Sequence, residues 1–255
     1  MKLRILGCGT SSGVPRIGND WGACDPQNPK NRRMRSSILV STADTHILVD
    51  TGPDLRQQLL DADSKRIDHV IWTHEHADHC HGIDELRQLY FALGGPVPCH
   101  ARPGALREIT QRFDFAFKGT GPYPSYAQPF PLSDNCTLGG ITVTAADMPH
   151  GSITSAALRF EYGGASVAYT TDFTGLTAKA MECVSDVDIW VVDALRRREH
   201  PTHPHLAQVL GWIEKARPKR AILTHMDHSM DYDMLSGELP DGVEPGYDGL
   251  EVEIG

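Results

Sequence analysis

Long hydrophobic runs are absent from this sequence of 255 residues, and no apolar stretch approaches the roughly 18 residues that a membrane span requires. The six cysteines are scattered and form no CxxC pair, which argues against a disulfide framework. Internal repeats and low-complexity tracts are missing as well. These absences exclude a membrane-spanning protein and favour reduced thiols. We therefore expect a cytoplasmic protein that has no membrane partner.

Basic residues are in the minority, because 24 Lys and Arg stand against 33 Asp and Glu, for a formal net charge of −9. This balance repels a phosphate backbone, so we expect a small substrate and no large nucleic-acid surface. Hydrophobic residues make up 40% and charged residues 22% of the chain, as in ordinary globular proteins. The length suits one α/β domain, which we expect to span residues 1–255.

Short β-type runs occur about twice as often as helical patterns. We expect strands within 3–8, 36–42, 45–50, 69–74, 141–147, 156–162, 165–172, 188–194, 220–225 and 250–255. Apolar residues three to four apart predict helices within 54–63, 82–93, 103–113, 174–184 and 204–216. This mixture favours two sheets face to face with helices covering them. Residues 14–35 and 114–135 are rich in Pro and Gly, and we expect two long loops there, either functional lids or surface excursions.

The stretch IWTHEHADH, residues 71–79, carries the chemistry. His74, His76, Asp78 and His79 stand together directly behind an apolar run, where a strand is expected to end. Imidazole and carboxylate are ligands that Zn²⁺, Mn²⁺ and Fe accept. Keeping four such groups together without a cation to offset their charges is costly. The stretch therefore predicts a metal site.

One peptide cannot complete two coordination spheres, so further ligands must come from other strand ends. His150, Asp172 and His225 each follow a β-type run. Asp172 has two oxygens and could bridge two ions, which leaves one site with His74, His76 and His150 and another with Asp78, His79 and His225. We expect two divalent cations per chain, Zn²⁺ or Mn²⁺, that share a bridging water. At a separation of roughly 4 Å, such ions turn this water into a hydroxide nucleophile near neutral pH.

HEHADH, followed by His150, Asp172 and His225, resembles the signature of the metallo-β-lactamase fold. The resemblance implies an αββα sandwich. Asp50 in LVDTG matches the first motif of that signature, where the family has an aspartate that braces the site without ligating metal. Asp172 stands in place of a cysteine, which implies the binuclear hydrolases and phosphodiesterases and not the antibiotic-hydrolysing branch.

Four further stretches, GCGTSSGVP, NPKNRRMRSS, LTHMDH and GYDGLEVEIG, resemble the phosphoribosyl 1,2-cyclic phosphate phosphodiesterases of phosphonate breakdown. The similarity runs from residue 3 to residue 254. It implies a small cyclic or nucleotide-like phosphodiester as substrate and allows a homodimer. In THPHL, His203 matches the general acid of that family, and with Asp78 it is assigned to catalysis. For His205 we favour a role in capping the following helix.

One feature departs from that family, and the role of a run of arginines stays open. The family carries a cysteine-rich structural zinc site in the early loop, of which only Cys24 and His228 remain here, so we predict no structural zinc. Arg196, Arg197 and Arg198 could clamp a phosphate, but a solvated charge run is favoured, and no residue is assigned to substrate binding.

Three other functions are compatible with the same ligands. A tRNA 3′-processing nuclease would need a protruding Gly- and Lys-rich arm, and the sequence has no segment of that kind. A thioester or lactone hydrolase would use the same metals but would not need His203, because a thiolate leaves without a proton. A metal-stabilised scaffold without activity is disfavoured, because complete ligand sets with an open position are typical of catalytic sites.

Overall fold

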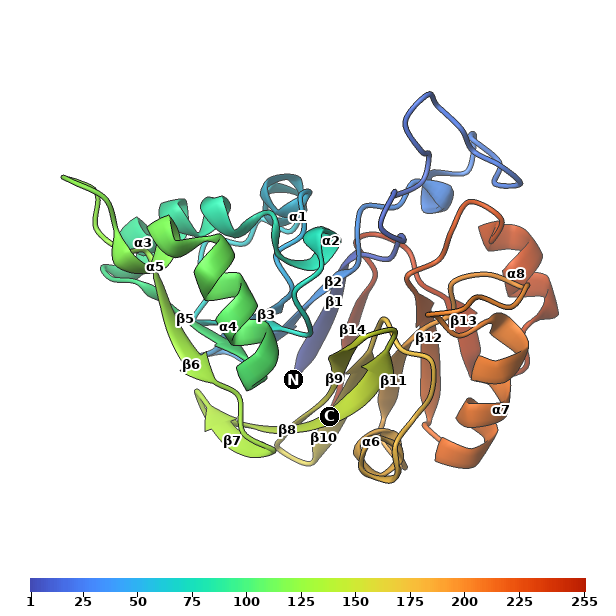
Figure 1. Cartoon of the computed structure of the whole chain (residues 1–255). Helices are drawn as coiled ribbons and strands as arrows, with labels where there is room; N and C mark the ends of the chain where they lie inside the picture. Colours follow the sequence, from blue (N-terminus) through green and yellow to red (C-terminus); the bar gives the residue numbers. More distant parts are fainter.

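The computed structural model describes all 255 residues, Met1–Gly255, and its strands form two seven-stranded sheets (Figure 1). In spatial order, the first sheet contains β14 (Glu251–Glu253), β1 (Lys2–Gly7), β2 (Ser37–Ser41), β3 (His46–Val49), β4 (His69–Trp72), β5 (Val97–Ala101) and β6 (Ala127–Pro131). The second contains β13 (Val243–Pro245), β12 (Arg220–Thr224), β11 (Ile189–Asp193), β10 (Ala165–Thr170), β9 (Ile153–Tyr162), β8 (Ile141–His150) and β7 (Asn135–Leu138). Each sheet mixes parallel and antiparallel pairs.

Helices cover the outer faces of both sheets. They are α1 (Leu55–Asp61), α2 (Ala77–Cys80), α3 (Leu86–Leu93), α4 (Pro103–Arg112), α5 (Asp114–Lys118), α6 (Ala178–Val184), α7 (Leu206–Ala216) and α8 (Tyr232–Glu238), with 3₁₀ turns at Pro29–Asn31 and Ile83–Glu85. The expected αββα sandwich is confirmed. None of the helices combines the length and apolar character that crossing a lipid bilayer requires.

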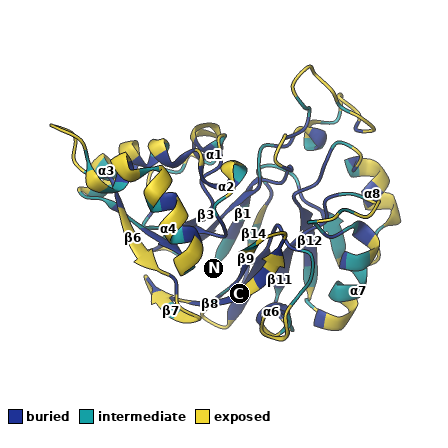
Figure 2. Cartoon of the chain, in the orientation of Figure 1, coloured by how far each residue is buried: buried dark blue, intermediate teal, exposed yellow.

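Alternation along the strands of the first sheet explains why both of its faces are covered. Ile38 and Val40 of β2 join the apolar core between the two sheets, whereas Leu39 packs with α1 residues such as Leu55 on the outer face. Successive side chains of a strand point to opposite faces, so a fully apolar strand needs a partner layer on each side. Figure 2 shows the consequence: the strands are largely buried, and the helices expose their outward faces.

Each of the ten expected β-type runs overlaps a strand, and each of the five helical patterns overlaps a helix. The early stretch 14–35 contains only the short turn Pro29–Asn31 as regular structure. The expectation of one long loop over 114–135 is wrong, because this stretch contains α5 and the edge strand β6.

Candidate metal centre

Four strands end at the same edge of the sandwich and carry the predicted ligands there. His74 follows β4, His150 is the last residue of β8, Asp172 lies just beyond β10, and His225 directly follows β12. The backbone of Asp172 and His225 is left-handed, with φ of 57° and 55°, and Asp50 after β3 has a φ of 64°. Non-glycine residues seldom adopt this conformation, and such strained positions cluster at active sites.

Two glycines bring the loop after β3 against the ligand-bearing turn. A Cβ atom on Gly82 would collide with the carbonyl oxygen of Gly52, and one on Gly52 would collide with the carbonyl oxygen of Asp78. Two backbone hydrogen bonds of 2.7 Å join these segments, from Thr51 N to His79 O and from Gly82 N to Thr51 O. This close approach places Asp50 beside His79.

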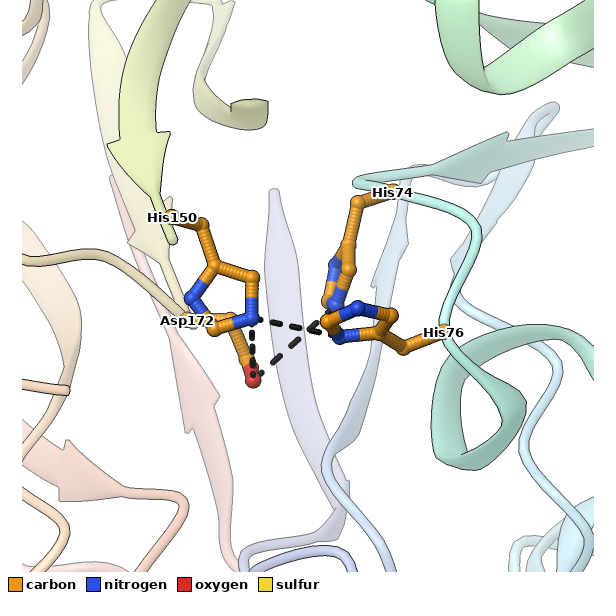
Figure 3. Close-up of side chains that lie close together, drawn as sticks. All are labelled: His74, His76, His150 and Asp172. Carbon is orange, nitrogen blue, oxygen red and sulfur yellow. Dashed lines mark hydrogen bonds and ion pairs between the residues drawn. The ribbon is translucent and has the colours of Figure 1, made fainter. Parts of the chain in front are cut away.

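His74, His76, His150 and Asp172 form the first of two ligand groups, and their ligand atoms lie within 4.8 Å of one another (Figure 3). His150 Nε2 is 3.2 Å from His76 Nδ1, and Asp172 Oδ1 is 3.7 Å from His150 Nε2 and 3.9 Å from His74 Nε2. The side chains converge from β4, the turn after it, β8 and β10, as Figure 3 shows.

The second group consists of Asp78, His79, Asp172 and His225, again within 4.8 Å. Asp172 takes part through its other oxygen: Oδ2 lies 3.1 Å from His79 Nε2 and 3.4 Å from His225 Nε2. Asp78 Oδ2 lies 3.3 Å from His79 Nε2 and 3.6 Å from His225 Nε2. The structure thus brings all seven predicted ligands together, with one oxygen of Asp172 facing each group.

Unpaired nitrogen atoms point into this space. The Nε2 atoms of His74, His79 and His225 are buried and have no hydrogen-bond partner. Buried polar atoms are almost always paired, so three orphaned imidazole nitrogens that face two carboxylates indicate that a further group belongs between them. The donor set of imidazole and carboxylate suits a divalent transition metal. The residues present therefore fit metal ions at both positions.

The Nδ1 atoms of His79 and His150 have partners that fix these two rings. Asp50 Oδ2 lies 2.7 Å from His79 Nδ1, and its Oδ1 accepts hydrogen bonds from the backbone N–H and the hydroxyl of Thr73. His150 Nδ1 lies 3.0 Å from the carbonyl oxygen of Thr202. Such outer contacts orient metal-binding imidazoles. Asp50 contacts His79 on the side away from the ligand groups, as a bracing residue would.

The carboxylates and imidazoles of the site shift one another's pKa. Burial raises the pKa of Asp172, but the imidazoles of His225 and His79 outweigh it and hold this pKa well below the usual range. Burial lowers the pKa of His225, but the carboxylates of Asp172 and Asp193 outweigh it and raise the pKa of His225 to about 9. The carboxylates are therefore ionised at neutral pH, which favours the binding of cations.

Asp193 is a site residue that we did not predict from the sequence. It is fully buried at the end of β11, and its Oδ2 accepts a hydrogen bond of 3.0 Å from the backbone N–H of Asp172. The same oxygen lies 3.0 Å from His203 Nδ1. The His203 ring stacks on His225, with centroids 4.9 Å apart and an interplanar angle of 12°. The sequence could have indicated this residue, because Asp193 lies near the end of the β-type run 188–194, as Asp172 lies at the end of the run 165–172.

Other residues singled out in the sequence lie outside the two groups. His205 occupies the N-cap position of α7, but its side chain makes no capping hydrogen bond, so the capping role expected for it is wrong. Arg197 pairs with Glu238 of α8, and Arg196 donates to the carbonyl oxygens of Arg198 and Glu199. These contacts agree with the interpretation that residues 196–198 are a solvated run of charges on the surface.

The early loop is held by a buried arginine. Arg33 donates to the carbonyl oxygens of Asp227 and Met230 and to Asn31 Oδ1, and its Nη1 lies 3.9 Å from Cys24 Sγ. A guanidinium next to this sulfur disfavours a second cation there. That Cys24 and His228 hold no structural zinc stays a prediction.

Known proteins share this architecture. A family model described as the β-lactamase superfamily domain matches residues 45–226. The crystal structure of a diphosphatase from the PhnP family superposes with a TM-score of 0.90 at 33% identity, over 99% of this chain and 97% of that one.

Curated relatives match with lower coverage of their own length. An octanoyltransferase of Porphyromonas gingivalis is 32% identical over the whole of this chain, which spans about half of that protein. A ribonuclease Z of Bradyrhizobium diazoefficiens is 30% identical over 48% of this chain and 42% of its own length. Together with the two ligand groups, these matches place the chain in the metallo-β-lactamase superfamily and, within it, in the PhnP family, as a metallo-hydrolase.

Proposed function

We propose that this protein is a binuclear metal-dependent phosphodiesterase that hydrolyses a small cyclic or nucleotide-like phosphodiester. The observation that carries the proposal is Asp172, whose two oxygens face two adjacent groups of imidazole and carboxylate ligands. Two-metal sites are typical of enzymes that cleave phosphate esters. The PhnP-family neighbour is described as a diphosphatase, which supports a phosphorus–oxygen bond as the target.

Two divalent cations, Zn²⁺ or Mn²⁺, would be held by the first ligand group and by the second. When bound, they would supply Lewis-acid charge stabilisation and a water of lowered pKa. The chain's own residues prepare for them. Asp50 orients the ring of His79, whose unpaired Nε2 faces the carboxylates, and the carbonyl oxygen of Thr202 orients the ring of His150.

His203 is placed to donate a proton to the leaving oxygen. Its Nδ1 is held by Asp193, its ring is fixed against His225, and 13% of its side chain is exposed at the rim of the site. An alkoxide is a poor leaving group, so a proton delivered as the bond breaks accelerates the reaction. Asp193 holds the ring in one orientation.

The alternatives receive less support. The sequence similarity to ribonuclease Z covers under half of the chain, and the net charge of −9 disfavours a long RNA contact. A thioester hydrolase would give His203 no proton to deliver, because a thiolate leaves without one. We further propose that the partner of this site is a small molecule, that no membrane is involved, and that the protein can pair as a homodimer in the cytoplasm.

The test is hydrolysis of bis-p-nitrophenyl phosphate by the purified protein, supplied with Mn²⁺ or Zn²⁺. We expect turnover that depends on metal, and we expect Asp172→Ala to abolish it, because this change removes a ligand from both groups at once. The matched control is Asp186→Asn at a surface ion pair, which should leave turnover unchanged. No turnover on a panel of cyclic nucleotides, ribosyl cyclic phosphates and dinucleotides would refute the proposal.

A further inference from the structure

The peptide at Glu75 lies between two ligands of the first group, His74 and His76, where the chain has left β4 and has not yet entered α2. Its neighbours are anchored by the backbone. On one side Ala156 N donates to Thr73 O at 3.0 Å, and on the other side α2 begins directly after His76. No backbone N–H donates to the carbonyl oxygen of Glu75. This carbonyl therefore depends on side chains for its hydrogen bonds.

Two side chains donate to the carbonyl oxygen of Glu75. Arg112, the last residue of α4, donates from Nη1 at 2.6 Å, and the thiol of Cys80 donates at 3.4 Å. A thiol is a weak donor, whereas a hydrogen bond from a charged guanidinium is a strong one. The bond from Arg112 is therefore the main contact that fixes the Glu75 peptide, and it ties the ligand-bearing turn to α4.

His76 is the ligand that depends most on this contact. The ring of His74 has an outer partner in Thr73 Oγ1, at 3.0 Å. The ring of His150 has one in the carbonyl oxygen of Thr202. The ring of His76 is exposed, and its only hydrogen-bond partner is His150, inside the ligand group. Because no outer contact fixes this ring, the backbone next to Glu75 determines where its imidazole lies.

We propose that Arg112 is a positioning residue of the first ligand group: it fixes the Glu75 peptide and thereby places the imidazole of His76 for a cation. The proposal rests on the two-metal site of the proposed function. Loss of an outer contact around a metal ligand typically lowers metal affinity about 10- to 100-fold. The second ligand group contains neither neighbour of Glu75, so Arg112 should affect one of the two cations and not the other.

The test is calorimetric titration of the metal-free protein with Mn²⁺, with the bound ions counted by native mass spectrometry. For Arg112→Ala we expect one of two binding events to weaken about tenfold or more and the other to stay unchanged. The Arg112 side chain is exposed, so its truncation removes no core packing. Arg112→Lys, which keeps a charged donor, should recover most of the lost affinity.

The matched control is Arg107→Ala on the same helix, where the side chain is 71% exposed. It should bind both ions as the wild type does. Equal weakening of both binding events in Arg112→Ala, weakening of neither, or the same loss in Arg107→Ala would overturn the proposal.

His76→Ala identifies the affected binding event, because this variant lacks a ligand of the first group alone. It should weaken the same event as Arg112→Ala. In the double variant, Arg112→Ala should lower the affinity by less than about threefold further, because its effect passes through His76. Losses that multiply in the double variant would show that Arg112 acts by another route, which contradicts the proposal.

Turnover separates a failure of this proposal from a failure of the proposed function. In Arg112→Ala, the Mn²⁺ concentration for half-maximal hydrolysis of a cyclic nucleotide should rise about tenfold, and kcat at saturating Mn²⁺ should match the wild type. A kcat that stays low at saturating Mn²⁺ would refute a role in positioning alone. If no phosphodiester is hydrolysed, the metal titrations still decide the role of Arg112, because they require no turnover.

Discussion

His203 and Asp193 form a pair whose contacts leave little freedom to the imidazole. Asp193 Oδ2 contacts both His203 Nδ1 and the backbone N–H of Asp172, each at 3.0 Å. The same oxygen therefore orients the candidate proton donor and the backbone of the bridging ligand. The position of His203 is therefore linked to that of the ligand groups. Substitution of either residue tests its role in proton transfer.

His203→Ala should slow substrates with an alkoxide leaving group much more than substrates with a nitrophenolate. Loss of a positioned proton donor costs about 10²- to 10⁴-fold where the leaving group needs the proton. We expect a fall of about 100-fold or more in kcat for a 2′,3′-cyclic nucleotide and less than about threefold for bis-p-nitrophenyl phosphate, both measured by steady-state kinetics. His200→Ala, in the same loop, is the control. An equal fall on both substrates would show that His203 is not the proton donor.

Asp193→Asn should act through His203. The amide removes the negative charge beside Nδ1, so the imidazole loses part of its orientation. We expect kcat for the cyclic nucleotide to fall about tenfold with KM nearly unchanged, because only the transition state gains from the proton. The double variant with His203→Ala should be no slower than His203→Ala alone. Losses that add would mean that Asp193 has a separate structural role.

At the scale of elements, the sequence is most informative where strands are central and least informative at the edges. β2, β3 and β4 have apolar residues on both faces and are evident as continuous runs. β5, β6, β7 and β13 escaped prediction. β6, β7 and β13 each lie at the edge of a sheet with one neighbour, whereas β5 lies between β4 and β6. β6 contains Pro129 and Pro131, which lack the N–H that a central strand requires. β6 forms by pairing with β5, which lies about 30 residues earlier and which the local pattern of β6 does not encode.

The metal ligands, too, could be predicted where they follow central strands. His74, Asp172 and His225 could be placed because each follows a central strand, and central strands that end at one edge of a sandwich meet there. The contribution of Asp193 depends on how β11 packs against its neighbours. Those distances arise from tertiary packing, which the spacing of residues along the chain does not specify.

Arg33 gives a prediction for an element, the early loop. Its buried guanidinium joins this loop to the carbonyl oxygens of Asp227 and Met230, in the segment just after the ligand His225. Arg33→Ala leaves these buried acceptors unpaired, so we expect the free energy of unfolding to fall by about 3 kcal/mol. Urea unfolding would measure this.

The neighbouring residue offers a matched control for that change. Arg32 is exposed and stacks on Trp21, with the guanidinium carbon 5.0 Å from the ring centroid. Arg32→Ala should change the free energy of unfolding by no more than about 0.5 kcal/mol. If both variants lost equal stability, the buried contacts of Arg33 would not be what holds the loop.

At the scale of the whole molecule, the ligand groups join the two sheets. His74, His76, Asp78 and His79 come from the end of β4 in the first sheet, and His150, Asp172 and His225 come from β8, β10 and β12 in the second. Both ligand groups contain residues from each sheet. A cation bound by either group would therefore hold the sandwich together at the edge where the strands end.

Removal of metal should consequently destabilise the whole fold and not only the site. A ligand at 100 times its dissociation constant stabilises the native state by about 2.7 kcal/mol. In a chain of this size each kcal/mol corresponds to roughly 2–4 °C in Tm. We expect EDTA to lower Tm by about 5–10 °C, measured by circular dichroism, and added Mn²⁺ or Zn²⁺ to restore it. Asp172→Ala should respond to neither, because it lacks the residue that both groups share.

Native mass spectrometry should find two ions per chain, and a third ion would place a metal in the early loop. If the Tm stayed unchanged after complete removal of metal, the two sheets would hold together without the cations.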